Sequence, residues 1–231
     1  MNTEIARFNM IEQQIRPWEV LDPGVLALLA RMRREDFVPP ALRALAFVDT
    51  QVPLLQGAAA RAAPGACMLE PKLEARLLQE LQLQHHERVL EIGTGSGFMA
   101  ALLAHRAQQV TTLECRSELA ALARQNLRHN GVDNVTVLDV SAAQGAQGLP
   151  SEGPFDAIVL SGSVAEMPAA LLQQLKPGGR LVAVVGDEPV MRARLVKRTA
   201  DTGVATFSQT DLFDTVVPRL EGFVEPSRFS F

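Results

Sequence analysis

The spacing of apolar residues predicts helices in the first eighty positions of this 231-residue chain. A first helix is expected to end at Pro17. Its apolar residues recur three or four positions apart and are expected to share one face: Ile5, Phe8, Ile11 and Ile15. A second helix is expected after Asp22-Pro23, where an N-cap residue precedes proline at the first helical position. Further helices are expected from Pro40 and over 71–81.

Residues 49–66 interrupt this pattern. They contain two prolines and two glycines among many alanines. This composition predicts a long loop, and long loops in compact domains often act as lids or linkers.

From residue 87 short apolar runs alternate with helical segments. Strands are expected at 88–92, 110–114, 135–138, 155–160 and 180–185, and helices at 98–105, 117–131 and 168–175. Ser117 is expected to cap the middle helix and Gly131 to end it. This alternation predicts a doubly wound α/β fold, a mostly parallel Rossmann-like sheet with helices on both faces.

In the last fifty residues the strand–helix alternation ends and a pattern of strands alone begins. Residues 190–198 alternate polar and apolar side chains, 201–203 form a turn signal, and 204–209 and 213–217 are expected to be strands. We therefore expect an antiparallel C-terminal edge on the sheet. The expected organisation is an N-terminal helical region with a substrate loop (1–70) and a cofactor-binding domain (71–231), forming one compact unit.

Composition narrows the function classes. The apolar fraction of 47% supports a substantial core, and a net charge of −4 without a basic block argues against nucleic-acid binding. The sequence contains no run of eighteen apolar residues, and the polar start argues against a secretory signal, so we expect neither membrane association nor export. Nothing in the pattern specifies an oligomeric state.

Cysteine and histidine usage adds two expectations. Cys67 and Cys115 could form a disulfide, but two reduced thiols in a cytoplasmic protein are favoured. The four histidines lack the spacing of a ligand set, so no metal site is expected.

The strongest chemical signal is a glycine-rich turn between an expected strand and helix. The segment 89–97 reads Val-Leu-Glu-Ile-Gly-Thr-Gly-Ser-Gly, with Gly93, Thr94, Gly95 and Gly97 in the turn. Glycine allows a tight turn and a close ligand approach, and the helix start offers free N–H groups. The dinucleotide-binding fingerprint is G-x-G-x-x-G, whereas the spacing here is G-x-G-x-G.

Two acidic residues make the turn more specific. Glu91 precedes the glycines by two positions, and a carboxylate there suits a ligand with an ammonium group better than a pyrophosphate. Glu114 ends the next expected strand, where an acid can accept hydrogen bonds from ribose hydroxyls. Together with the turn residues they predict a site for S-adenosylmethionine. The alternatives are a nicotinamide dehydrogenase and a plain glycine turn between two surface acids.

These residues resemble the class I methyltransferases, and the wider chain resembles the protein-L-isoaspartate O-methyltransferase family. The resemblance covers about residues 5–222. Its segments are 34–39, 41–42, 44–47, 49, 53–54, 70–71, 89–97, 154–158, 175–179, 185–187 and 217–220. The N-terminal block and the closing Val-Pro-x-Leu are more specific to the family than the middle segments.

The resemblance implies an enzyme of protein repair. Its substrates would be proteins or peptides with an isoaspartyl residue, whose carboxylate would attack the methyl group of S-adenosylmethionine. Such a carboxylate is ionised at pH 7, so no general base is required, and alignment and water exclusion would supply the catalysis. The alternatives are methyl transfer to a different acceptor and cofactor binding without catalysis.

The acceptor side departs from the family pattern, which has the form Gly-x-x-Ile-Ser-x-Pro before the helix at 71. Here the segment 65–71 is Gly-Ala-Cys-Met-Leu-Glu-Pro, which places Leu69 at the serine position. Leucine donates no hydrogen bond, and Glu70 would repel an anion. Cys67 is either a weak substitute donor or a small packed side chain.

Two other polar segments follow expected strands. The family's Gly-Asp-Gly after the third strand is replaced by Asp139-Val140-Ser141, and we expect Asp139 to contact the adenine, with Ser141 as the alternative. Ser161 and Ser163 follow the fourth strand, at the sheet edge where such folds bind ligands. Their hydroxyls either help to hold a substrate carboxylate or belong to an ordinary polar junction.

Overall fold

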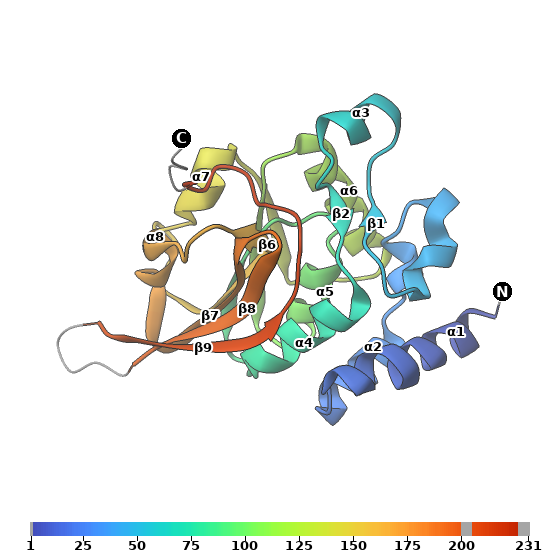
Figure 1. Ribbon diagram of the computed structural model, residues 1–231, viewed down its shortest axis with the longest axis horizontal. Coiled ribbons are helices and arrows are strands. Elements are labelled where there is room, and N and C mark those ends of the chain that lie inside the picture. Colours follow the sequence, from blue (N-terminus) through green and yellow to red (C-terminus); the bar gives the residue numbers. More distant parts are fainter. Residues whose placement is uncertain (1, 200–204, 226–231) are drawn as a thin grey trace.

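Seven strands form one sheet in the order β5-β4-β3-β6-β7-β8-β9 in the computed structural model, which describes residues 2–199 and 205–225 (Figure 1). The first five strands in this order pair in parallel, and β8 and β9 add antiparallel. Their bounds are β3 Arg88–Ile92, β4 Gln109–Glu114, β5 Val135–Asp139, β6 Phe155–Val164, β7 Leu175–Asp187, β8 Val190–Arg198 and β9 Phe207–Asp214. The predicted α/β class and its antiparallel edge are confirmed.

The helices cover both faces of this sheet. They are α1 Thr3–Met10, α2 Pro23–Arg31, α3 Gly57–Ala62, α4 Pro71–Leu81, α5 Phe98–Ala104, α6 Ser117–His129, α7 Ala142–Gln147 and α8 Ala169–Leu172. Side chains alternate between two hydrophobic clusters, so Val89 packs with the N-terminal helices, α4 and α5, whereas Leu90 packs with α8. The larger cluster extends from Met10 to Val217 and therefore includes side chains from both sides of residue 70.

The first helix forms, but its expected apolar face is wrong. Ile11 and Ile15 are buried, whereas Ile5 is 58% exposed and Phe8 is 62% exposed. A five-residue π-helical segment, η1 (Ile11–Ile15), follows α1, and a 3₁₀ turn, η2 (Arg16–Trp18), ends it. The wider π turn changes the angle between successive side chains, so the 3.6-residue spacing no longer aligns all four residues.

The rest of the N-terminal region is less regular than expected. The segment from Pro40 is a 3₁₀ helix, η4 (Pro40–Phe47), preceded by a short one, η3 (Arg34–Asp36). The expected loop 49–66 contains helix α3 and strand β1 (Val52–Pro53), which pairs with β2 (Cys67–Met68). This small hairpin holds the segment before α4 in place.

Helix α6 ends as expected but begins at a different cap residue. Gly131 adopts the left-handed conformation predicted for a helix stop, with φ of 65°. Ser117 was expected to be the N-cap, which is wrong, because Arg116 occupies that position and Ser117 is the first helical residue. The carboxylate of Glu114 accepts from the N–H groups of Cys115 and Arg116 just before the helix.

Strands β6 and β7 are longer than the hydrophobic runs predicted. A helix was expected over 168–175, but α8 is only four residues long and β7 begins at Leu175. The N–H of Phe155 donates to the carbonyl of Gln174, and Phe155 pairs with Leu175. Residues 175–179 therefore belong to strand β7 of the sheet. Register shifts between β6 and β7, one at Phe155/Ala157 and one at Val159/Ser163, accommodate the extra residues.

The C-terminal edge is one hairpin. Two strands were expected, at 204–209 and 213–217, but one strand, β9, runs from Phe207 to Asp214. The prediction of strand for residues 215–217 is wrong. The expected turn at 201–203 and residue 204 lie outside the described residues.

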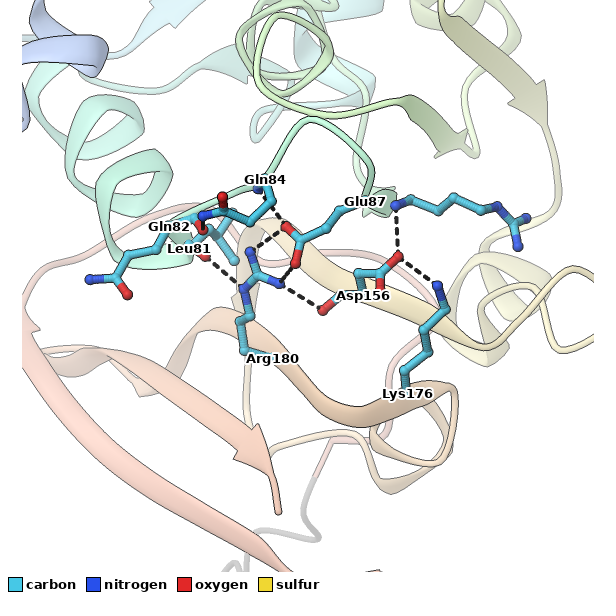
Figure 2. Close-up of polar contacts among 8 residues, drawn as sticks. Leu81, Gln82, Gln84, Glu87, Asp156, Lys176 and Arg180 are labelled. Atoms are coloured by element: carbon cyan, nitrogen blue, oxygen red, sulfur yellow. Dashed lines mark hydrogen bonds and ion pairs between the residues drawn. The ribbon is translucent and has the colours of Figure 1, made fainter. Parts of the chain in front are cut away.

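A buried ion pair joins elements at the amino end of the sheet (Figure 2). Arg180 Nη2 lies 2.7 Å from Oε2 of Glu87, and its Nε lies 2.6 Å from the carbonyl oxygen of Leu81. Nearby, the Asp156 carboxylate accepts from Lys176 and from the N–H of Arg88, and these contacts hold the pKa of Asp156 below its usual value despite partial burial. Figure 2 shows both carboxylates beside the loop that connects α4 to β3.

Candidate active site

The glycine-rich turn connects β3 to α5 in the predicted manner. Gly93, Gly95 and Gly97 all have positive φ angles, of 93°, 53° and 84°. A Cβ on Gly97 would lie 3.2 Å from Cβ of Ala123 on α6, and one on Gly93 would lie 2.8 Å from Cδ2 of Leu220. Glycine is therefore required by backbone conformation and by close packing on both sides of the turn.

A cavity of about 520 Å³ opens beside this turn at the carboxyl ends of the parallel strands. Gly93 and Gly95 form one wall, and Glu114 with the residues that follow β4 forms another. Pockets for small organic ligands have volumes of about 300–1,000 Å³. Ligands of open α/β sheets bind at this edge, so the cavity is the candidate site.

Glu114 lies in the cavity wall, at the end of β4. One carboxylate oxygen accepts from the N–H of Gly95 at 2.9 Å, and the other accepts from Cys115 and Arg116 at 3.0 and 3.1 Å. Burial raises its pKa, while the three backbone N–H groups act in the opposite direction. These contacts fix the carboxylate at the cavity edge, where it can accept further hydrogen bonds.

Glu91 lies behind the cavity rather than in its lining. Its side chain is 0% exposed, and its two oxygens accept from Ser161 and Thr112, each at 2.7 Å. Thr94 is also buried and lies 2.6 Å from Thr112, oxygen to oxygen. Burial raises the pKa of Glu91 to about 8.

The adenine-side candidates lie near the cavity but outside its lining. Asp139 is exposed at the end of β5, and Ser141 caps α7 through a reciprocal contact with Gln144. Val140 and Ala142, their neighbours, line the cavity instead. The structure thus brings an apolar side chain and a small one to the place where polar contact was expected.

The acceptor-side candidates separate in the same way. Cys67 lines the cavity and its thiol contacts Oε1 of Gln51 at 3.6 Å, whereas Leu69 is buried in the larger hydrophobic cluster. Burial raises the pKa of Cys67 to about 12, with Glu70 and Glu74 contributing, so the thiol is neutral. Ser161 lines the cavity, and Ser163 is buried and donates to the carbonyl of Val217 at 3.0 Å.

Sequence reasoning missed a segment that covers this cavity. Residues 216–222, named here the C-terminal strap, cross from the end of β9 over the sheet toward α7 (Figure 1). The N–H of Ser163 donates to Pro218, the N–H of Leu220 donates to Ser163, and Glu221 forms an ion pair with Arg116. The family-like Val-Pro-x-Leu motif marked this segment, but periodicity gave no indication of its place over Gly93.

Gln51, in the predicted loop, is a second residue that was missed. It lines the cavity, and its Nε2 donates to Oε1 of Glu70 at 3.2 Å and to the carbonyl of Val216 at 3.3 Å. It therefore links the β1–β2 hairpin to the C-terminal strap across the acceptor side.

Within residues 2–199 and 205–225, no group of three or more His, Cys, Asp or Glu side chains could hold a metal ion. The same part of the chain contains no helix that is long and apolar enough to cross a membrane.

Comparison with known proteins identifies relatives over most of the chain. Residues 6–218 match the family model described as protein-L-isoaspartate(D-aspartate) O-methyltransferase. A protein-L-isoaspartate O-methyltransferase of Methanoculleus marisnigri is 40% identical over 193 residues, which is 83% of each chain. One of Rhodopseudomonas palustris is 38% identical over 220 residues, 94% of this chain and 95% of its own.

Solved structures share the fold at lower identity. A putative protein-L-isoaspartate O-methyltransferase from Plasmodium falciparum, in complex with S-adenosyl-L-homocysteine, matches with a TM-score of 0.70 and 19% identity. The match covers 96% of this chain and 99% of that one. Another protein-L-isoaspartate O-methyltransferase matches with a TM-score of 0.76 and 21% identity, over 94% of this chain and 67% of its own.

Proposed function

Because the chain belongs to the protein-L-isoaspartate O-methyltransferase family, we propose that it methylates the carboxylate of isoaspartyl residues in damaged proteins, with S-adenosylmethionine as the methyl donor. The observation that carries this proposal is the cavity at the carboxyl edge of the sheet. It connects the glycine turn and Glu114 with Cys67, Gln51 and Ser161. A donor and an acceptor could therefore meet in one cavity.

The residues present fit S-adenosylmethionine. Gly93 and Gly95 present only backbone to the cavity, and the Glu114 carboxylate is held where ribose hydroxyls could donate to it. Val140 and Ala142 offer a surface for a flat ring. When bound, the cofactor supplies an electrophilic methyl group on a sulfonium.

The chain's own contribution to the reaction is alignment. An isoaspartyl carboxylate is ionised at pH 7 and needs no residue to deprotonate it. The C-terminal strap and the β1–β2 hairpin enclose the acceptor side, and Gln51 holds the two together. Orientation and exclusion of water are then the main catalytic effects expected of the protein.

The proposed function predicts selective methyl transfer. The full-length protein with radiolabelled S-adenosylmethionine is expected to label an isoaspartyl peptide and to leave the matched aspartyl peptide at background. Labelling of neither peptide, with S-adenosylhomocysteine binding intact by calorimetry, would reject an isoaspartyl acceptor and leave a cofactor-binding protein or another acceptor. Binding of NAD in place of S-adenosylhomocysteine would reject the methyl donor.

Replacing Cys67 is expected to change acceptor affinity. A hydroxyl is a stronger donor than a thiol, so Cys67→Ser should lower the KM for the isoaspartyl peptide by about 2- to 10-fold. Cys115→Ser changes the other cavity cysteine, beside Glu114, and is expected to leave the peptide KM within about 2-fold. Initial rates at saturating cofactor measure both, and an unchanged peptide KM in Cys67→Ser would mean that position 67 only packs.

We also propose that the protein is cytoplasmic. What supports this is that Cys67 and Cys115 are both free thiols, as expected of a reducing compartment.

A further inference from the structure

A chain of short hydrogen bonds runs from the cavity into the sheet. Ser161 Oγ lies 2.7 Å from Oε1 of Glu91, and Oε2 of Glu91 lies 2.7 Å from Thr112 Oγ1. Thr112 in turn lies 2.6 Å from Thr94. The four residues belong to β6, β3, β4 and the glycine turn, whose backbone pairing fixes their spacing. Ser161 is the member of this chain that lines the cavity.

The protonation state of Glu91 decides where these hydroxyl protons point. An ionised carboxylate only accepts, so Ser161 and Thr112 both donate to it and Thr94 donates to Thr112. A protonated carboxyl donates one hydrogen bond. With that proton on Oε1, Ser161 accepts it, and the Ser161 O–H becomes free to donate into the cavity.

Other strong donors on the acceptor side are engaged. The Ser163 hydroxyl donates to Val217, and the Gln51 amide N–H groups donate to Glu70 and Val216. The Cys67 thiol is a weak donor. Arg116 and Arg219 also line the cavity, and they form ion pairs with Glu221 and with Asp187 and Glu225. Ser161 is therefore the uncharged donor on the acceptor side that a change in Glu91 can release.

The surroundings of Glu91 favour its neutral form. It is 0% exposed, and burial raises its pKa to about 8. The hydrogen bonds from Ser161 and Thr112 lower the pKa, whereas Glu74 on α4 and Glu114 on β4 raise it. The cation Arg34 forms its ion pair with Glu74 rather than with Glu91.

We propose that the Ser161 hydroxyl donates a hydrogen bond to the acceptor carboxylate, and that protonated Glu91 is the positioning residue that turns this hydroxyl toward the cavity. The inference rests on the proposed function, since it assigns a contact to the anionic acceptor of that reaction. Glu91 exchanges no proton with the substrate. It selects one of two hydroxyl orientations.

The test is the pH dependence of kcat/KM for the isoaspartyl peptide at saturating cofactor, between pH 6 and 9.5. The wild-type value should fall as pH rises through about 8. Once Glu91 is ionised, the Ser161 hydroxyl donates its hydrogen bond to Glu91 instead of to the acceptor. Glu91→Gln keeps an N–H donor in place at every pH, so this fall should disappear. A fall caused by the ammonium group of the cofactor would remain in the variant.

Variants at position 161 separate this role from a structural one. Ser161→Ala should raise the peptide KM by about 10- to 100-fold and abolish the pH response, with S-adenosylhomocysteine affinity within about 2-fold of wild type. Ser161→Thr keeps the hydroxyl and should restore the pH response even if its rate is lower. Ser208→Ala, exposed on β9, controls for the substitution.

Two results would overturn the proposal. One is a pH response that persists in Glu91→Gln, and the other is an unchanged peptide KM in Ser161→Ala. If the proposed function itself is wrong, the wild-type protein will transfer no methyl group to the isoaspartyl peptide at any pH. That result would also reject the role proposed for Ser161 and Glu91.

Discussion

Arg180→Met is expected to lower the free energy of unfolding by about 3–5 kcal/mol, because it leaves Glu87 buried without its partner. Arg180 is 8% exposed and also donates to the carbonyls of Leu81 and Asp156, which connect α4 and β6 to β7. Chemical denaturation followed by circular dichroism measures the change.

An exposed arginine on the same sheet is the matched control. Arg192 pairs with Asp211 and Asp214 on β9 at the surface, where solvent screens the charges and such pairs add little stability. Arg192→Met should therefore be close to wild type. The double variant Arg180→Met/Glu87→Met should recover much of the loss, since no unpaired charge remains. Equal effects of the two single arginine variants would contradict the role assigned to the buried pair.

Arg34→Met is expected to destabilise the protein by a similar amount, about 3–5 kcal/mol, and also to impair the acceptor side. Arg34 is 1% exposed, forms an ion pair with Glu74, and donates to the carbonyls of Ala46 and Leu69. Its guanidinium lies 4.8 Å from the ring centroid of Phe98 on α5. One side chain thus joins the N-terminal region, the segment that carries Cys67, and the helix after the glycine turn.

The loss in Arg34→Met should depend on pH. Burial raises the pKa of Glu74 to about 7 and Arg34 lowers it, so removing Arg34 raises that pKa further. A carboxyl whose pKa is higher when folded than unfolded loses stability as pH rises through the folded value. The destabilisation should therefore be larger at pH 8 than at pH 6. A pH-independent loss would mean that packing against Phe98, rather than the ion pair, dominates.

Activity assays distinguish the second effect of Arg34→Met. At a temperature where the variant is folded, the peptide KM should rise while S-adenosylhomocysteine affinity, which depends on the turn at Gly93 and on Glu114, should change little. A parallel loss of both affinities would indicate that the variant disturbs the whole sheet.

The sequence determined the features that depend on neighbours along the chain. Alternation of apolar strands with helices predicted the parallel sheet, since a buried parallel strand must be apolar on both faces. The spacing of Gly93, Gly95 and Gly97 after a strand predicted the turn, because positive φ angles at all three positions require glycine. Glu114 lines the cavity because it directly ends a strand whose carboxyl end opens there.

Only the tertiary structure decided which side chains face the cavity. Glu91 and Thr94 are buried behind it, Leu69 packs in the core, and Val140 and Ala142 line the wall in place of Asp139. The C-terminal strap reaches the glycine turn from more than one hundred residues away, through hydrogen bonds to Ser163 that no local period encodes. Local spacing fixes the backbone of a turn, whereas the direction of a side chain depends on contacts between distant segments, which form only when the sheet is assembled.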